Sequence, residues 1–185
     1  MNGALDALRL EFTRHAGRSL ALPLAGAIVW TVVAVAGLVL APRTAALVLL
    51  FGTGAIFPVG LALAALLRER LLDNPSPLAG LMGRSVLMVN LLWAVHLSLF
   101  AHDPTYVPLT LGIGLGLHWI VFGWIVDGSV GMVHAVLRTL LVTAAWWAFP
   151  DASVPAVGFA VVATYLVTIA LMARRPLPAS ARLTA

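Results

Sequence analysis

Two ionisable residues, Arg138 and His134, lie deep in one of the long apolar segments of this chain. Arg138 is near the centre of a predicted helix over residues 129–149. Its guanidinium is therefore roughly 14 Å from either end, too far for the side chain to reach water. His134 is one turn earlier on the same face, so it shares the same surroundings. A charge at this depth is costly unless hydrogen-bond acceptors or an anion surround it.

No carboxylate of the chain lies at the depth of Arg138. All of them are at predicted helix ends or outside the helices: Asp6, Glu11, Glu69, Asp73, Asp103, Asp127 and Asp151. The charge must be answered by carbonyl groups, by Asn90 or His118, by water in a cavity, or by an anion from outside the protein. We expect a ligand-binding pocket lined by deep polar and aromatic side chains: Arg138, His134, His118, Asn90, Trp93 and Trp119.

Each of these residues also has a purely structural interpretation. A His in a helical bundle is commonly a hydrogen-bonded core residue, and a deep Trp commonly fills space. The chain has no Cys, and its His and acidic residues show no HxxxH, HxxE or HExxH spacing. No nucleophile, base and orienting acid occur together. The sequence therefore predicts no catalytic residue, metal ligand or cofactor.

The composition identifies an integral membrane protein. Of 185 residues, 62% are hydrophobic and only 10% are charged, and the mean hydropathy is +1.04. A soluble domain of this size needs more polar surface. The net charge of +4 comes mostly from segments that flank the apolar runs, so it indicates contact with membrane lipids and no nucleic-acid partner.

Apolar runs of about 20 residues recur along the whole chain, the length that crosses the hydrocarbon core. We predict an all-α fold, a single membrane domain over residues 1–185 with six transmembrane helices in one bundle. A short amphipathic helix over residues 3–16 precedes them, with Leu5, Leu8 and Phe12 on one face. The predicted spans are roughly 20–41, 44–67, 79–101, 105–126, 129–149 and 152–173.

The arginines predict the orientation. Eight of them flank the spans on one side, and Arg43 alone lies on the other; the eight are Arg9, Arg14, Arg18, Arg68, Arg70, Arg174, Arg175 and Arg182. Because cytoplasmic segments carry the excess of positive charge, both termini are expected in the cytoplasm. Every basic residue is Arg, a usage associated with GC-rich bacterial genomes, so we expect a bacterial inner membrane.

Polar and small residues predict the packing of individual spans. Arg84, Asn90 and His96 point to three sides of the third span, so we expect that helix to be central. Gly112, Gly116 and Gly123 form a stripe on the fourth span that lets another helix approach closely, within the chain or in a homo-oligomer. Pro58 is expected to kink the second span or free a carbonyl there.

Three segments carry a resemblance to a known family: FGTGAIFPVGLALAALL (51–67), NPSPLAGLMG (74–83) and HWIVFGWIVDG (118–128). In these segments the chain resembles an uncharacterised family of small bacterial membrane proteins with six spans. The resemblance covers most of the chain, including the amphipathic start. It implies this architecture but no site residues and no activity.

The deep Arg138 favours one function: binding or transport of a small anionic or amphipathic, lipid-like molecule in an intramembrane polar pocket. A second hypothesis is a non-catalytic membrane subunit that acts through its glycine-rich helix faces. A third is a lipid-modifying enzyme with His118 or His134 as base. An enclosed polar site favours the first hypothesis, and an exposed glycine stripe favours the second.

Overall fold

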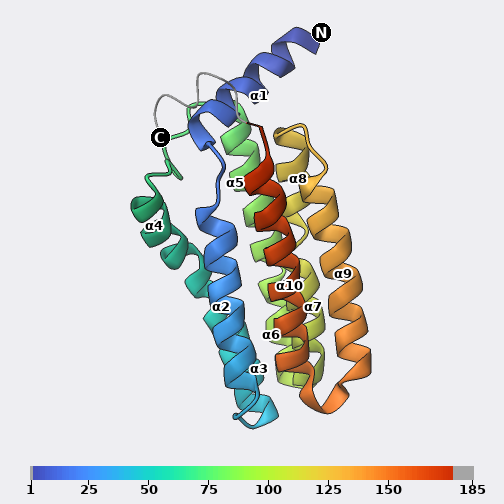
Figure 1. Ribbon diagram of the computed structural model, residues 1–185. Helices are drawn as coiled ribbons and strands as arrows, with labels where there is room; N and C mark the ends of the chain where they lie inside the picture. The colour runs from blue at the N-terminus through green and yellow to red at the C-terminus, as the bar shows by residue number, and fades with distance from the viewer. Residues whose placement is uncertain (1, 177–185) are drawn as a thin grey trace.

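The computed structural model describes residues 2–176 and is helical throughout, with no strand in that range (Figure 1). The α-helices are α1 (Asn2–Ala16), α2 (Ala21–Gly37), α3 (Pro42–Gly52), α4 (Ile56–Leu67), α5 (Pro77–Leu91), α6 (Trp93–His102), α7 (Val107–Gly114), α8 (His118–Ile125), α9 (Val130–Ala148) and α10 (Ser153–Arg174). Short 3-10 helices, Thr53–Ala55, Pro104–Tyr106 and Pro150–Ala152, precede α4, α7 and α10. The predicted all-α fold is confirmed.

Five helical stretches of the described chain are long and apolar enough to cross a membrane: Pro42–Leu67, Pro77–His102, Pro104–Ile125, Val130–Ala148 and Pro150–Arg174. A sixth crossing is possible because α1 and α2 form a pair bent by 60°. With 17 residues, α2 is about 26 Å long. The predicted multi-pass bundle is confirmed, with boundaries that differ from the expected ones by a few residues.

Helix α1 lies across one end of the bundle, which we call the α1 end (Figure 1). Arg9 connects it to the turn between α8 and α9 through an ion pair with Asp127, with 3.0 Å between Nη1 and Oδ1. The Asn74 amide donates to the Phe12 carbonyl, and Phe12 itself is buried. The apolar face predicted for residues 3–16 therefore packs against the start of α5.

The elbow between α1 and α2 is fixed by residues from distant parts of the chain. Gly17 turns the backbone with φ +58°, a conformation that a side chain disfavours. The Glu69 carboxylate accepts from the amides of Leu20 and Ala21, which satisfies donors at the start of α2. Arg175 donates to the Gly17 carbonyl, so the end of α10 returns to the α1 end.

Two of the apolar stretches are broken near their middle. Pro42–Leu67 is interrupted at Thr53–Ala55, just before Pro58, which cannot donate a backbone hydrogen bond. The 3-10 interruption lies where Pro58 was expected to disturb the helix, by a kink or by a freed carbonyl. The stretch Pro104–Ile125 is interrupted at residues 115–117, between α7 and α8. Helices α9 and α10 continue without a break, and they pack against each other.

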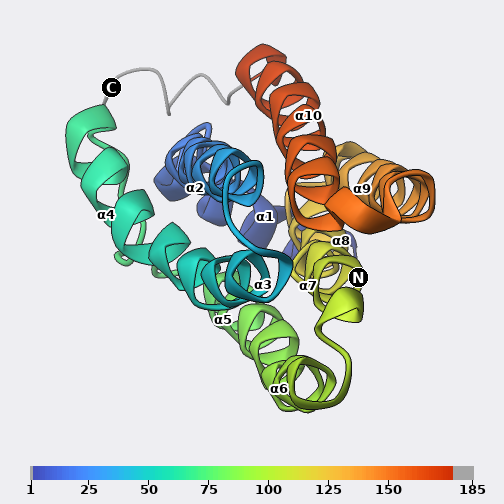
Figure 2. The same cartoon turned by 90° about the horizontal axis from the view of Figure 1, so that it is seen from below.

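The centre of the bundle is α10, which packs most extensively against α2 and α9 and also contacts α7. Helices α4 and α6 lie at its margin (Figure 2). The expectation that the third span is central is wrong: Pro77–His102 is the least buried of the five stretches. The reason is that Asn90 donates to the Val86 carbonyl of its own helix and therefore needs no neighbour.

The glycine stripe of the fourth span packs inside the chain, as predicted. A Cβ at Gly112 would lie 2.9 Å from Val142 of α9, and one at Gly116 would lie 2.6 Å from Cδ of Arg138. A Cβ at Gly123 would lie 2.9 Å from the Cα of Gly131. Helix α9 therefore sits directly on this stripe, and its close approach brings Arg138 against the break between α7 and α8.

Candidate functional site

Arg138 is completely buried, in the middle of α9. It follows the start of the helix by about 12 Å and precedes the end by about 15 Å, so the charge cannot reach either surface. The predicted burial of this residue is confirmed. The immediate surroundings of the guanidinium come from α7, α2 and α10, as its individual contacts show.

One acceptor for Arg138 comes from the break between α7 and α8. In a continuous helix the Gly116 amide would donate to the Gly112 carbonyl, but here it donates to Ile113, at 2.8 Å. The Gly112 carbonyl is left free by this tighter turn, and it accepts a short hydrogen bond from Nε of Arg138. The broken helix thus supplies a backbone carbonyl, one of the groups expected to accept from Arg138.

Two aromatic rings lie beside the guanidinium. Its Cζ is 5.2 Å from the ring centroid of Trp30 on α2 and 5.5 Å from that of Tyr165 on α10. At these distances the π-electron faces attract the cation, by about 2 kcal/mol when the pair is shielded from water. A ring face neutralises no charge and leaves the in-plane N–H groups of the guanidinium to find other acceptors.

No well-formed hydrogen bond in the described part of the chain involves Nη1 or Nη2 of Arg138, although the Tyr165 hydroxyl lies near enough to interact with the guanidinium. Together they carry four N–H donors. An unsatisfied buried donor costs about 1–3 kcal/mol, and more when the group is charged. Arg138 is therefore a buried positive charge without a counter-ion among the described residues. Its unsatisfied donors, Nη1 and Nη2, lie on one edge of the guanidinium.

His134 has a defined tautomer because of its partner. Its Nδ1 is 2.7 Å from the hydroxyl of Thr168 on α10, and that hydroxyl donates to the Thr164 carbonyl at 2.8 Å. A hydroxyl has one proton to donate, so the Thr168 oxygen must accept from His134. The His134 proton is therefore on Nδ1, and Nε2 presents a lone pair. Nε2 is buried and has no partner in residues 2–176.

Trp119 of α8 fixes the plane of the His134 ring. The two rings stack with 4.3 Å between centroids and 20° between planes, and Tyr165 meets His134 edge-on at 5.1 Å. The indole N–H groups of Trp119 and Trp30 are buried, and neither has an acceptor among the described residues. We refer to Trp30, Trp119, His134, Arg138, Tyr165 and Thr168 as the Arg138 cluster.

His118, the first residue of α8, lies next to this cluster. It is half-buried, and its Nδ1 has no partner in the described chain. Its ring centroid is 5.9 Å from that of Trp119, which in turn stacks on His134. Trp119 therefore lies between the two histidines, with His118 at the edge of the Arg138 cluster and His134 within it.

Four of the six residues expected in the pocket lie together: Arg138, His134, His118 and Trp119. The other two, Asn90 and Trp93, lie elsewhere. Asn90 is exposed and bonded within α5. Trp93 is half-buried and pairs with Phe51 of α3, with 5.8 Å between ring centroids. Depth in the membrane was similar for all six, but depth does not specify which side of a helix faces the core.

The sequence did not point to several contributors: Trp30, Tyr165, Thr168 and the Gly112 carbonyl. Thr164 and Thr168 are spaced by one turn on the last span, and Tyr165 lies between them, so a polar stripe was visible there. Its importance was hidden because these residues carry no charge. Apart from the neighbouring glycines, nothing in the sequence indicated that the Gly112 carbonyl would be free to accept from Arg138.

His96 of α6 makes the same kind of hydrogen bond as His134, from Nδ1 to a Thr hydroxyl. Its Nδ1 is 3.1 Å from the Thr110 hydroxyl, which in turn donates to the Tyr106 carbonyl at 3.1 Å. By the argument used for His134, its proton is on Nδ1. Its buried Nε2 has no partner in the described chain and lies over Gly114. The residues known to contact it include no cation.

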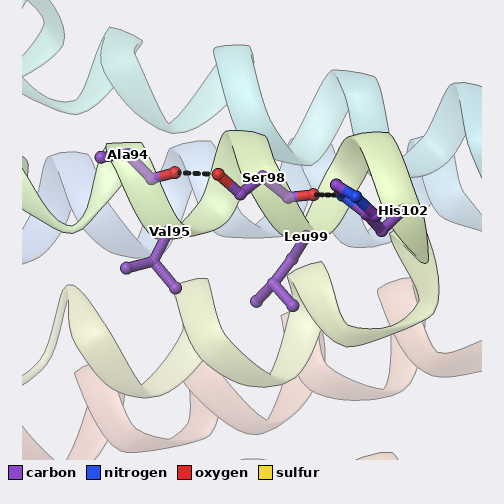
Figure 3. Close-up of a pocket in the computed structure, with 5 residues that line it drawn as sticks. All are labelled: Ala94, Val95, Ser98, Leu99 and His102. Atoms are coloured by element: carbon purple, nitrogen blue, oxygen red, sulfur yellow. Dashed lines mark hydrogen bonds between the residues drawn. The ribbon is translucent and has the colours of Figure 1, made fainter.

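The two best-defined hollows on the described part of the surface are not lined by the Arg138 cluster. One, of about 460 Å³, lies along α6 between Ala94 and His102. Figure 3 shows that its polar side chains, Ser98 and His102, each bond one turn back along the helix. The other, of about 500 Å³, lies at the end opposite α1, beside Arg43, Pro104 and Asp151.

No group of three or more His, Cys, Asp or Glu side chains in residues 2–176 is placed to hold a metal ion. What the Arg138 cluster offers is a set of buried donors around a positive charge, with one acceptor beside them. Such a set suits an anion of few atoms, because the enclosing side chains are almost completely buried.

Comparison with known protein families identifies the family of this chain. The model of a family of unknown function, DUF7010, matches residues 5–175. The chain belongs to the DUF7010 family. The match covers nearly all of α1 to α10, so the Arg138 cluster lies wholly within the family region. The sequence resemblance to an uncharacterised family is confirmed to this extent. Neither the curated proteins nor the solved structures gave a match.

Proposed function

We propose that this DUF7010 protein binds a small anion at the Arg138 cluster, as the binding step of transport across a membrane. The observation that supports this most directly is the pair of buried Arg138 nitrogens, Nη1 and Nη2, without a well-formed hydrogen bond in the described chain. The cluster holds two more buried donors, the indole N–H of Trp30, whose ring lies beside the guanidinium, and that of Trp119, whose ring stacks on His134. An anion would accept from several of these donors and neutralise the charge.

The broken helix supports the transport part of the proposal. Transporters commonly bind their substrates near the middle of the membrane, where discontinuous helices expose backbone groups. Here the break between α7 and α8 lies at the level of Arg138, and its Gly112 carbonyl already holds the guanidinium. Rearrangement at residues 115–117 would change the coordination of the bound anion.

The competing hypothesis of a subunit that acts through exposed glycine faces loses its support. Gly112, Gly116 and Gly123 are covered by α9 of the same chain.

We further propose that the protein lies in a bacterial inner membrane with the α1 end in the cytoplasm. The support is the set of exposed arginines at that end: Arg14, Arg18, Arg68, Arg70 and Arg174. Arg182, also used for this orientation, lies outside the described residues.

Native mass spectrometry of the detergent-purified protein tests the proposed function. The wild type should carry a co-purifying anion, and both Arg138→Gln and Arg138→Leu should release it. The empty variants should unfold at the wild-type temperature or above, because an uncompensated buried charge has been removed. The mass of the released species separates a free small anion from a lipid.

Arg84→Gln is the matched control, because Arg84 is exposed and its Nη1 extends back along α5 to Gly80. This variant should keep the ligand. A wild type with nothing bound, together with a strongly destabilised Arg138→Leu, would show that Arg138 has a structural function only.

A further inference from the structure

Resting on the proposed function, we infer that the anion is a small oxyanion that keeps one O–H, of the class to which hydrogen carbonate belongs. The Arg138 cluster offers donors from Nη1 and Nη2 and from two indole groups, all suited to anionic oxygens. It also offers one acceptor, Nε2 of His134. A ligand that satisfies both kinds of group must accept hydrogen bonds and donate one.

The acceptor character of His134 follows from the geometry around Thr168. The Thr168 hydroxyl donates its proton to the Thr164 carbonyl, so His134 must hold its own proton on Nδ1. A second proton on Nε2 would place an imidazolium beside the Arg138 cation, and like charges repel in a medium of low dielectric constant. Nε2 therefore remains an acceptor.

No protein donor meets this nitrogen in the described chain. The stacked Trp119 ring holds the imidazole plane, with 4.3 Å between the centroids, so the lone pair has a fixed direction. A ligand without a proton would leave Nε2 unsatisfied and would bring its negative oxygens close to a lone pair. A site with a buried acceptor of this kind rejects an analogue that lacks the matching hydroxyl.

The burial of the cluster limits the size of the ligand. Trp30, His134 and Arg138 are fully buried, and Trp119 and Tyr165 are almost so. A lipid headgroup with its chains attached would have to pass between these helices. A free oxyanion of few atoms needs a much smaller opening between the helices, so we assign the site to a free ion and not to a lipid phosphate.

Hydrogen carbonate and nitrate make a sharp pair of probes, because both are planar monoanions of similar size and only the first carries an O–H. Equilibrium dialysis with labelled hydrogen carbonate, with unlabelled nitrate as competitor, measures both affinities on the purified wild type. We expect at least a tenfold preference for hydrogen carbonate. His134→Phe should abolish the preference and leave nitrate binding intact, whereas His96→Phe should preserve the preference.

Thr168→Val provides a second test in case His134→Phe does not fold. Without the Thr168 acceptor, His134 can place its proton on Nε2, so the preference should shift toward nitrate. Nitrogen-15 NMR of labelled histidine reports the tautomer directly, and Nδ1 of His134 should be the protonated nitrogen in the wild type.

The outcomes distinguish this inference from the proposed function. Equal affinity for the two anions, lost together in Arg138→Leu, would overturn the oxyanion assignment and leave anion binding standing. Binding of neither probe to the wild type would overturn both. Displacement of hydrogen carbonate only by a phospholipid, and not by nitrate at any concentration, would assign the site to a lipid headgroup and overturn the assignment to a free ion.

Discussion

His134 and His96 have the same local partners but lie in different surroundings. Each places a proton on Nδ1, donates it to a Thr hydroxyl, and leaves a buried Nε2 without a partner. Beside His134 lies a cation with four N–H groups that also lack well-formed hydrogen bonds, whereas the described neighbours of His96 are Thr110, Leu92 and Gly114. One unsatisfied acceptor alone costs free energy, but complementary unsatisfied groups in one cluster can bind a ligand.

The helices also pack differently around the two histidines. His134 lies under α8, which contacts α9 through backbone at Gly123 and Gly131. His96 lies over Gly114, where the nearest atoms are side chains that can move. Backbone contact fixes the Arg138 cluster more rigidly, and a rigid cluster selects its ligand more strictly.

The largest effect is expected from a methyl group placed between α8 and α9. Gly131→Ala would put a Cβ against the Trp119 carbonyl and the Gly123 backbone, neither of which can rotate away. The helices must separate, and overpacking of this kind costs about 1–3 kcal/mol or more. Thermal unfolding in detergent should show a clear loss of stability, and hydrogen carbonate binding should weaken.

Gly114→Ala is the matched variant at the other histidine. Its Cβ would meet only Leu92 Cδ1 at 3.2 Å and His96 Nε2 at 3.5 Å. Alanine also favours the helix by up to about 1 kcal/mol, so the stability should stay within about 1 kcal/mol of wild type. Equal losses in the two variants would contradict the distinction between backbone and side-chain contact.

An intermediate effect is expected from removal of each Thr hydroxyl. Thr168→Val removes the partner of His134 Nδ1 in a fully buried site, so this nitrogen is left unsatisfied in either tautomer, at a cost of about 1–3 kcal/mol. Thr110→Val should cost less, because Thr110 is only partly buried and its contact to His96 is longer, at 3.1 Å. Unfolding temperatures of both variants measure the difference.

The serine variants serve as controls here, since Thr168→Ser and Thr110→Ser keep the hydroxyl and should recover most of the loss. If Thr110→Val were the more destabilising of the two valine variants, the burial argument would fail and His96 would be the more constrained site.

The smallest effect concerns the turn that begins α7 and so positions Thr110. The Thr105 hydroxyl and amide donate to the Asp103 carboxylate, and these bonds hold the pKa of Asp103 below its usual 3.8. Since the folded-state pKa is depressed, this contribution to stability is complete above pH 3.8 and is lost as the pH falls through the folded-state value.

Thr105→Val keeps the amide bond and removes the hydroxyl bond, so the Asp103 pKa should rise toward the usual value. A carbon-13 NMR titration of the carboxyl group measures this, with Thr105→Ser expected to behave as the wild type. An unchanged pKa in Thr105→Val would mean that the backbone amide alone lowers it. His96 and His134 should be unaffected in either case.

The sequence alone determined the class of the molecule and the unusual place of Arg138. Composition and the repeated apolar runs are set by the length needed to cross hydrocarbon, so the all-α multi-pass bundle followed from them. The distance of Arg138 from both helix ends is a matter of residue count, and the cost of exposing a charge to lipid at that depth predicted its burial. Its one-turn spacing from His134 likewise placed the two residues on one face.

Only the tertiary structure decided which polar residues meet. Asn90 is about as deep as Arg138, yet its amide bonds within α5, because a helix can satisfy a short polar side chain by itself. Trp30 and Tyr165 come from the first and last spans, and no periodicity within one helix specifies a contact between two. The Gly112 acceptor exists because the turn at residues 115–117 tightens, which depends on how α9 packs against the glycines.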